Sequence, residues 1–208
     1  MRIAILGAGA VGGALAGVWV KAGHQVVLAA RDPAAEKVRD LAARTGASAA
    51  TVAQAVAGAE AVLLATPWPA VAEAVAAAGS LAGRILIDAT NPLKPDLSGL
   101  DVAPGSSGAA YIASLAPGAH VVKCFNQTGW ENMAGVHFPT GQPVMFVAGD
   151  DAAAKAAVRG LAREAGFEDA DAGGLAAAAL LENLAMLWIH LMVKQGAGRS
   201  FAFGLLHR

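Results

Sequence analysis

Short apolar runs alternate along the chain with stretches in which apolar residues recur every three or four positions. The uninterrupted runs predict buried strands at 2–6, 25–30, 61–65, 84–88, 120–125 and 144–148, with weaker strands near 47–49 and 167–171. The periodic stretches predict helices between these strands, and the longest of them covers 175–195. This alternation is typical of an α/β fold with a doubly wound, mainly parallel sheet.

Signals at the ends of the elements refine this picture. Asp32 and Pro33 predict a helix that starts directly after the second strand, because Asp caps helices and Pro fits their first turn. Residues 93–107 are rich in Pro, Gly and Ser and predict a long loop of the kind that often carries function. The 208 residues are enough for one compact unit. We expect residues 1–150 to form the core and residues 151–208 a small C-terminal helical extension packed on it.

A glycine turn follows the first predicted strand and leads into a helical pattern, in the order Gly7-Ala8-Gly9-Ala10-Val11-Gly12. In a Gly-x-Gly-x-x-Gly turn the first glycine permits the bend, and the second lets the backbone approach a pyrophosphate. The third allows the helix to pack closely on the strand. The helix N-terminus then offers free N–H groups to phosphate. The turn therefore predicts a Rossmann-type dinucleotide-binding core.

The end of the second strand indicates which dinucleotide is bound. An acidic residue about 20 positions after the turn would bind the ribose 2′-hydroxyl of NAD, but the strand ends in Ala30 and Arg31. Arg31 can pair with the 2′-phosphate of NADP, and Lys37 can add charge. The alternative makes Asp32 the ribose ligand and favours NAD. Because Asp32 is expected to cap a helix, we favour NADP(H).

Three other strand ends are expected to surround the nicotinamide and the substrate, because ligands of parallel sheets bind beyond the carboxyl ends of the strands. Thr66 and Asn91 can hydrogen-bond the nicotinamide ribose or carboxamide, although Thr-Pro and Asn-Pro are also ordinary loop starters. Asn126 is the candidate orienting residue for a polar ring. Pro67 and Pro92 directly follow Thr66 and Asn91 and keep the backbone there out of a helical conformation.

Composition and charge exclude several other classes of protein. The net charge is −1, so nucleic acid is not expected as a partner. No His or Cys spacing indicates a metal site, and no nucleophile motif is present, so we assign no catalytic acid, base or nucleophile. The single cysteine, Cys124, lies in an apolar run and is predicted to be a core thiol.

No membrane segment or secretion signal is expected. The apolar stretch 175–193 contains Glu182 and Asn183, which favours a buried helix over a membrane span. The first residues form a strand rather than a signal peptide, and we therefore expect a cytoplasmic protein.

These motifs resemble those of the NADPH-dependent deazaflavin (coenzyme F-420) reductases and of the cytosolic domain of the STEAP metalloreductases. The resemblance rests on the glycine turn, Ala30-Arg31, Thr66-Pro67-Trp68, residues 121–126 and residues 171–175. It implies a homodimer and hydride transfer between NADP(H) and a deazaflavin (coenzyme F-420) or a flavin such as FMN or FAD. It also implies that Ala65, Thr66 and Pro67 lie beside the nicotinamide.

Two alternative functions remain open. An imine or keto-acid reductase shares this type of opening fold, but such enzymes usually need a larger helical domain than residues 151–208 provide. A nucleotide-sensing or partner-binding module is the non-enzymatic alternative, in which the last helix with Trp188 and Met192 forms the contact face.

Overall fold

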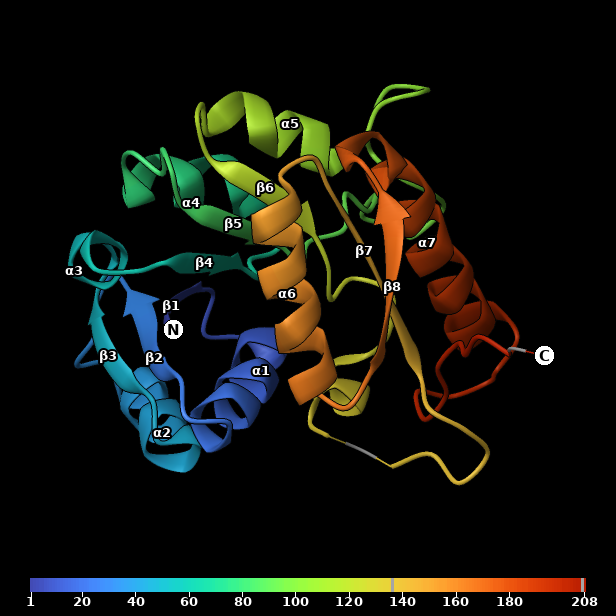
Figure 1. Cartoon of the computed structure of the whole chain (residues 1–208), viewed down its shortest axis with the longest axis horizontal. Helices are drawn as coiled ribbons and strands as arrows, with labels where there is room; N and C mark the ends of the chain where they lie inside the picture. The colour runs from blue at the N-terminus through green and yellow to red at the C-terminus, as the bar shows by residue number, and fades with distance from the viewer. Residues whose placement is uncertain (136, 207) are drawn as a thin grey trace.

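The computed structural model describes residues 1–135, 137–206 and 208 and contains one eight-stranded sheet. The strand order is β3-β2-β1-β4-β5-β6-β7-β8, as Figure 1 shows. The strands are β1 (Arg2–Leu6), β2 (Gln25–Ala30), β3 (Ser48–Thr51), β4 (Ala61–Leu64), β5 (Ile85–Asp88), β6 (His120–Lys123), β7 (Val144–Gly149) and β8 (Glu168–Gly173). The predicted doubly wound α/β fold is confirmed.

All neighbouring strands run parallel except β6 and β7. Between these two, the chain crosses the carboxyl end of the sheet through loops and the short 3-10 helix η2 (Trp130–Met133). Without a crossover helix to return the chain to the other edge, the next strand must run in the opposite direction. The extension after residue 150 supplies β8 to the same sheet. The boundary at residue 150 itself stays a prediction.

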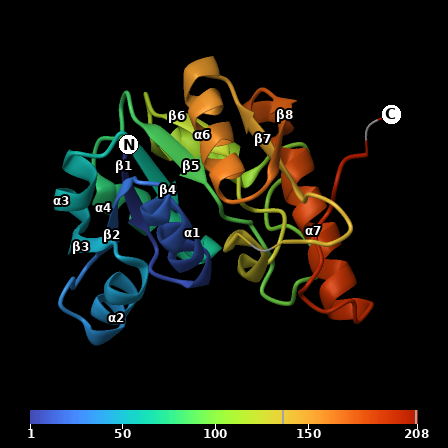
Figure 2. The same ribbon diagram turned by 60° about the horizontal axis from the view of Figure 1, so that its bottom comes forward.

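Helices cover both faces of the sheet. On one face, α1 (Ala10–Lys21), α2 (Glu36–Thr45) and α6 (Ala152–Glu164) enclose a core that includes Trp19 and Phe125. On the other face, α3 (Val52–Ala57), α4 (Val71–Ala78) and α5 (Gly108–Leu115) enclose a second core with Val62 and Ile112. The 3-10 helix η1 (Trp68–Ala70) leads into α4. Figure 2 shows α1 and α6 side by side over the first face.

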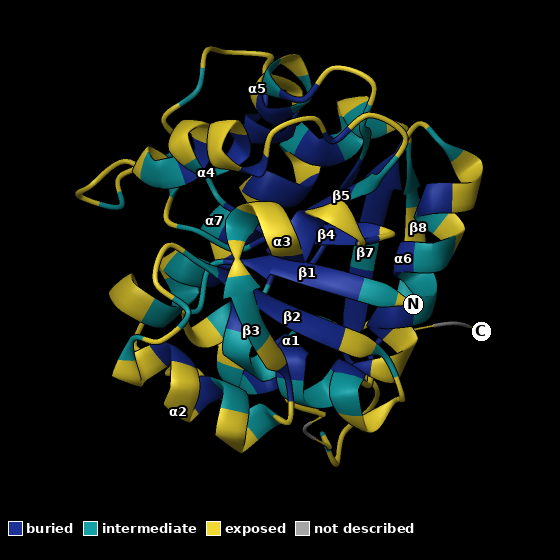
Figure 3. Ribbon diagram, turned by 90° about the vertical axis from the view of Figure 1, so that its left-hand side faces the viewer, coloured by how far each residue is buried: buried dark blue, intermediate teal, exposed yellow. Residues whose placement is uncertain are grey.

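The central strands are buried on both faces, which explains why their sequences are continuous apolar runs rather than alternating ones. All four residues of β4 are fully buried, whereas the outer sides of α2, α3 and α4 are exposed (Figure 3). Cys124 is also fully buried, as predicted, and this burial raises the pKa of its thiol well above the ordinary value.

The last helix, α7 (Ala178–Lys194), follows the 3-10 helix η3 (Leu175–Ala177) and packs on α5 and β7. Trp188 is buried and stacks on Phe201 of the C-terminal segment, with ring centroids 5.1 Å apart. The side of α7 that faces away from α5 and β7 is apolar, and it is exposed at Leu180 and Leu187. Trp188 is therefore not available as a contact face.

Two of the predicted boundaries that differ from the structure have a clear local cause. The second helix begins at Glu36 rather than directly after Asp32, because the Asp32 carboxylate accepts a hydrogen bond from the Ala34 N–H and closes a turn instead. The strand predicted at 120–125 ends at Lys123, and Phe125 has a positive φ of 60° that no extended strand adopts.

Candidate functional site

The carboxyl ends of the parallel strands meet at one edge of the sheet. The chain leaves β1 toward α1 on one face and leaves β4 toward α4 on the other, so the edge opens between these two strands. In doubly wound sheets such a switch point is where ligands bind. The predicted site residues at the ends of β1, β2, β4 and β5 lie along this edge.

The glycine turn has the shape that phosphate binding requires. Gly7 has a φ of 118°, and a Cβ there would lie 2.5 Å from the carbonyl oxygen of Ala65. A Cβ on Gly12 would lie 2.1 Å from the carbonyl oxygen of Gly7, whereas one on Gly9 would meet nothing within 4 Å. Gly9 is the N-cap residue of α1, and no described side chain caps the amides of the first turn. These amides are therefore available to an anion.

A cavity of about 140 Å³ brings together three of the predicted residues, Gly7, Arg31 and Thr66, which come from three different strand ends. The Thr66 hydroxyl is buried, and it has no hydrogen-bond partner among the described residues. A buried hydroxyl without a partner costs free energy unless a ligand satisfies it. Thr66 thus brings an unpaired polar group to the wall of this cavity.

Arg31 forms an ion pair with Glu73 of α4 across the mouth of this cavity. Both side chains are largely exposed, at 82% and 64% of their full area. Exposed ion pairs contribute little stability. A phosphate with two negative charges can therefore displace Glu73 from the guanidinium.

Lys37 lies elsewhere. It stands in the first turn of α2 and lines a second cavity, of about 410 Å³, together with Gly9, Ala10 and the exposed Trp130. Lys37 is not among the residues that line the cavity with Arg31. The two cations that the sequence analysis assigned to one phosphate thus line different cavities.

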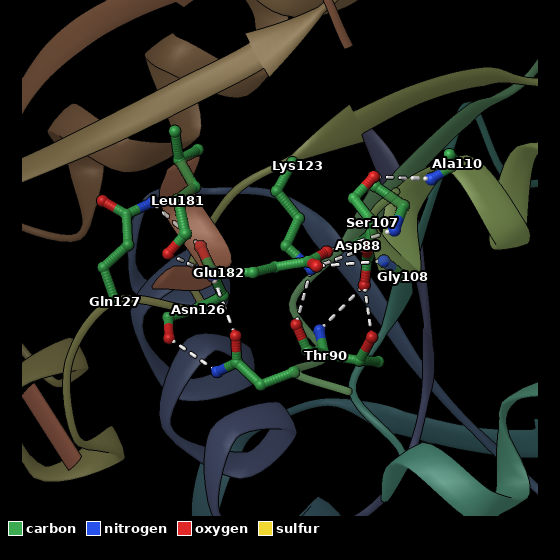
Figure 4. A network of polar contacts seen from close by, with 12 residues as sticks. Asp88, Thr90, Ser107, Gly108, Ala110, Lys123, Asn126, Gln127, Leu181 and Glu182 are labelled. Atoms are coloured by element: carbon green, nitrogen blue, oxygen red, sulfur yellow. Dashed lines mark hydrogen bonds and ion pairs between the residues drawn. The ribbon is translucent and has the colours of Figure 1, made fainter. Parts of the chain in front are cut away.

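Asn91 and Asn126 hold each other at the ends of β5 and β6. The Asn91 Nδ2 donates to the Asn126 carbonyl at 2.8 Å, and the Asn126 Nδ2 donates to Asn91 Oδ1 at 3.0 Å. Asn126 also donates to the Leu181 carbonyl, and its Oδ1 accepts from Gln127 at 2.9 Å (Figure 4). Asn126 is buried with both amide atoms engaged, whereas Asn91 is half-buried. This geometry suits Asn126 to positioning Asn91.

The remaining predicted residues lie along the same edge and differ in how far they are exposed. Ala8, Ala30 and Ala65 are half-buried, and Pro67 is exposed. The side chain of Val11 packs toward the core, which leaves its backbone at the turn. Pro92 is buried close to Gly108 of α5.

A buried charged cluster was missed by the sequence analysis. Lys123 Nζ lies 2.8 Å from Asp88 Oδ2 and 2.9 Å from Glu182 Oε1, and all three side chains are fully buried. Lys123 also donates to the Thr90 carbonyl at 2.6 Å, and Asp88 accepts from the Thr90 amide and hydroxyl (Figure 4). The cluster therefore fixes the segment that leads from β5 to Asn91.

Glu182 extends this cluster to two helices. It belongs to α7, and its carboxylate accepts from the amides of Gly108 and Ala109 at 3.0 and 3.2 Å. These amides open α5, so a distant carboxylate supplies the negative charge that a helix N-terminus favours. The sequence does contain one signal for this cluster. Asp88, Lys123 and Glu182 are charged residues inside otherwise apolar stretches, which indicates that they are buried and paired.

Of the part of the chain that the structure describes, one helical stretch, Leu175–Lys194, is long and apolar enough to cross a bilayer by length and composition. It carries the buried Glu182 and packs on α5. Only 28% of its apolar window is buried, so the prediction of a buried helix over 175–193 holds for one side of α7 alone.

A protein-family model described as NADP oxidoreductase, coenzyme F-420-dependent, matches residues 2–92. This range contains the glycine turn, Arg31, Thr66 and Asn91. The chain is also similar to a proposed F-420-dependent NADP-reductase from Arthrobacter sp. fb24. Their sequences are 33% identical, and the crystal structure of that protein matches this one with a TM-score of 0.89. That comparison covers 100% of both chains.

Two other relatives are named as reductases or as a related NADPH-binding enzyme. Metalloreductase STEAP3 from Rattus norvegicus is 32% identical over 190 residues, and this chain spans only 36% of its length. The aligned residues are 88% of this chain. A reductive aminase from Aspergillus terreus, solved with NADPH and ethyl-5-oxohexanoate, is 26% identical with a TM-score of 0.69, over 94% of this chain and 63% of that one.

Proposed function

The chain belongs to the coenzyme F-420-dependent NADP oxidoreductase family, and from this premise we propose that it transfers a hydride between NADP(H) and a flat deazaflavin or flavin. The observation that carries the proposal is the cavity shared by Gly7, Arg31 and Thr66. It joins a phosphate-binding turn, a cation for a 2′-phosphate and a buried hydroxyl without a partner.

The residues fit NADP(H) in a definite order along the sheet edge. The backbone of residues 7–12 holds the pyrophosphate, and Arg31 beside Ala30 holds the 2′-phosphate after releasing Glu73. The Thr66 hydroxyl, between Ala65 and Pro67, bonds the cofactor. Asn91 and Pro92 border the nicotinamide, with Asn126 behind Asn91 as its positioning residue. Lys37 adds positive charge near Gly9 and Ala10 from the neighbouring cavity.

When bound, NADPH would supply a hydride from its nicotinamide ring. The acceptor takes this hydride, with its two electrons, and one proton from solvent, so that NADPH, a proton and the oxidised acceptor give NADP and the reduced acceptor. Such a reaction needs two rings held in contact and little acid–base catalysis from the protein. The residues along the edge provide backbone N–H groups, hydroxyl groups and side-chain amides that can orient the two rings. This set of groups suits a reaction that depends on the positions of the rings.

The proposed enzyme works in the cytoplasm as a homodimer, without nucleic acid or membrane partners. The exposed apolar side chains of α7 support the dimer, because a second copy would cover Leu180, Leu187 and Val193. Light scattering after gel filtration measures the mass directly, and a monomer at micromolar concentration would contradict this part of the proposal.

An acceptor panel tests the proposed reaction. The purified protein is mixed with NADPH and, in turn, coenzyme F-420, FMN, FAD, imines and keto acids, while absorbance at 340 nm reports oxidation. We expect turnover with a deazaflavin or flavin and none with imines or keto acids. Turnover with an imine or keto acid alone would assign the alternative reductase activity. Tight NADPH binding without turnover across the panel would assign the nucleotide-sensing alternative.

A further inference from the structure

A cavity of about 440 Å³ lies between η1, the start of α4, α5 and the long loop before α5. Trp68, Asp101, Ser106 and Tyr111 are among its lining residues. It lies on the flank of η1 and α4 that carries Pro69 and Ala72, while Ala70 and Glu73 on the other flank line the Arg31 cavity. The Arg31 cavity, at the 2′-phosphate end of the proposed cofactor site, and this cavity therefore lie on two flanks of one short helical segment.

Two aromatic rings form one wall of the cavity. Trp68 and Tyr111 meet edge to face, with centroids 5.7 Å apart and planes at 64°. Tyr111 is 45% exposed, and Trp68 is half-buried. A Cβ on Gly108 would lie 3.0 Å from the Trp68 ring and 3.2 Å from Pro92, so the ring packs beside the residue that follows Asn91. The wall thus adjoins the nicotinamide end of the proposed site.

The loop that faces this wall is held in place. The Asp101 amide donates to the Pro92 carbonyl at 2.6 Å, and Leu93 and Leu100 form a β-bridge. Ser107 caps α5 by accepting from the Ala110 amide. The Asp101 carboxylate and the Ser106 hydroxyl have no side-chain partner among the described residues. The lining includes no cation.

From these contacts we infer that the Trp68–Tyr111 cavity binds the ring system of the acceptor, an inference that rests on the proposed function. Deazaflavins and flavins present a flat face and one edge on which an imide N–H lies between two carbonyls. The aromatic wall offers a stacking surface, the Asp101 carboxylate accepts from the imide N–H, and the Ser106 hydroxyl donates to a carbonyl. The same carboxylate repels an anionic tail, so the ring and not the tail enters here.

Equilibrium binding to the NADP-loaded protein tests this inference without relying on turnover. The probes are riboflavin and coenzyme F-420, and quenching of their fluorescence reports stacking on an aromatic ring. We expect Trp68→Ala to raise the Kd of both probes about tenfold, whereas Trp68→Phe raises it less than about threefold, because a smaller ring still stacks. Asp101→Ala, on an exposed loop, is expected to raise the Kd about fivefold through loss of one charge-assisted hydrogen bond.

Two controls separate this inference from the proposed function. Leu180→Ala removes an exposed apolar side chain on α7, and the Kd of both probes should stay within about twofold of wild type. NADPH binding by calorimetry should be unchanged in every variant. A wild-type protein that binds NADPH but neither probe overturns the cavity assignment, as does a Trp68→Ala variant with unchanged Kd. Failure to bind NADPH would instead overturn the proposed function.

Discussion

At the scale of single residues, the three glycines of the turn meet different constraints. Gly12 is fixed by contact with the Gly7 carbonyl, so the fold itself requires it. Gly9 faces open space, and its backbone conformation at φ −91° is available to any residue. The fold therefore does not require glycine at position 9, and under the proposed function the requirement comes from the ligand.

This difference predicts opposite phenotypes for two substitutions. Gly12→Ala should destabilise the protein by about 3 kcal/mol or more, because backbone must move to admit the Cβ. Gly9→Ala should unfold at the wild-type temperature but bind NADPH at least about tenfold more weakly, because its Cβ meets the pyrophosphate. Thermal unfolding and calorimetric titration measure the two effects.

Gly17→Ala, on the same helix as Gly12, is the matched control, since its Cβ would lie 3.8 Å from Thr45 of α2, at ordinary van der Waals distance. We expect it to bind NADPH normally and to gain up to about 1 kcal/mol of stability, as alanine favours helix. Normal NADPH affinity in Gly9→Ala would contradict the proposed path of the pyrophosphate.

At the other end of the proposed site, Glu73 competes with the 2′-phosphate of the cofactor for Arg31. Arg31→Ala should raise the KM for NADPH by about 10–100-fold and change the KM for NADH much less, because only NADPH carries the 2′-phosphate. Glu73→Gln frees the guanidinium and should lower the KM for NADPH by about twofold. Steady-state kinetics with both nucleotides measures these values. Equal effects of Arg31→Ala on NADPH and NADH would rule out the assignment of NADP.

At the scale of elements, the buried charged cluster joins β5, β6, α5 and α7. Asp88 and Lys123 are register partners on adjacent strands, and Glu182 reaches them from α7 while it caps α5. Two carboxylates share one ammonium group out of contact with water. Such clusters are costly to break, because any charge left alone is buried without compensation.

Lys123→Met should therefore destabilise the protein by about 3–5 kcal/mol, since it leaves both carboxylates without a cation. Glu182→Gln retains polar contacts to α5 and should cost less, about 1–3 kcal/mol. Lys194→Met, at the exposed end of α7, should change stability by less than about 0.5 kcal/mol. Urea unfolding followed by circular dichroism gives the three values, and an equal loss for Lys123→Met and Lys194→Met would refute a structural role of the cluster.

At the scale of the whole molecule, the outer edge of the sheet depends on ion pairs between α6 and β8. Burial raises the pKa of Asp169, but hydrogen bonds from Arg163 and Arg159 outweigh it, and the net pKa lies below the ordinary value. The hydrogen bond from Lys155 lowers the pKa of Asp171. These carboxylates stabilise the folded protein as anions.

The sign of the pH dependence follows from these lowered pKa values. The stabilisation is fully present above the ordinary carboxylate pKa of 3.8 and is lost as the pH falls through the lower folded values. Exchanging Arg159 and Arg163 for Gln should lower the Tm at pH 7 by about 2–4 °C and move the acid-unfolding midpoint to higher pH. Lys21→Gln, an exposed control on α1, should leave both unchanged, and an unshifted acid midpoint in the double variant would contradict the assignment.

The sequence by itself determined the strands, the fold class and the glycine turn, and it also supplied the proposal that Arg31 is the cation for a 2′-phosphate. These features depend on local order: an apolar run, a spacing of glycines, or the residue that ends a strand. Asp32 shows the limit of local signals, because a capping residue can close a turn instead of starting a helix.

The tertiary structure alone decided which side chains meet. Asp88 and Lys123 are 35 positions apart, and Gly108 and Glu182 are 74 apart, yet both pairs are in contact. The same applies to the different cavities that Lys37 and Arg31 line, to the engaged amide of Asn126 and to the cavity lined by Trp68. Such contacts arise when strands and helices pack to bury apolar surface, and the spacing of residues along the chain does not encode where their side chains then lie.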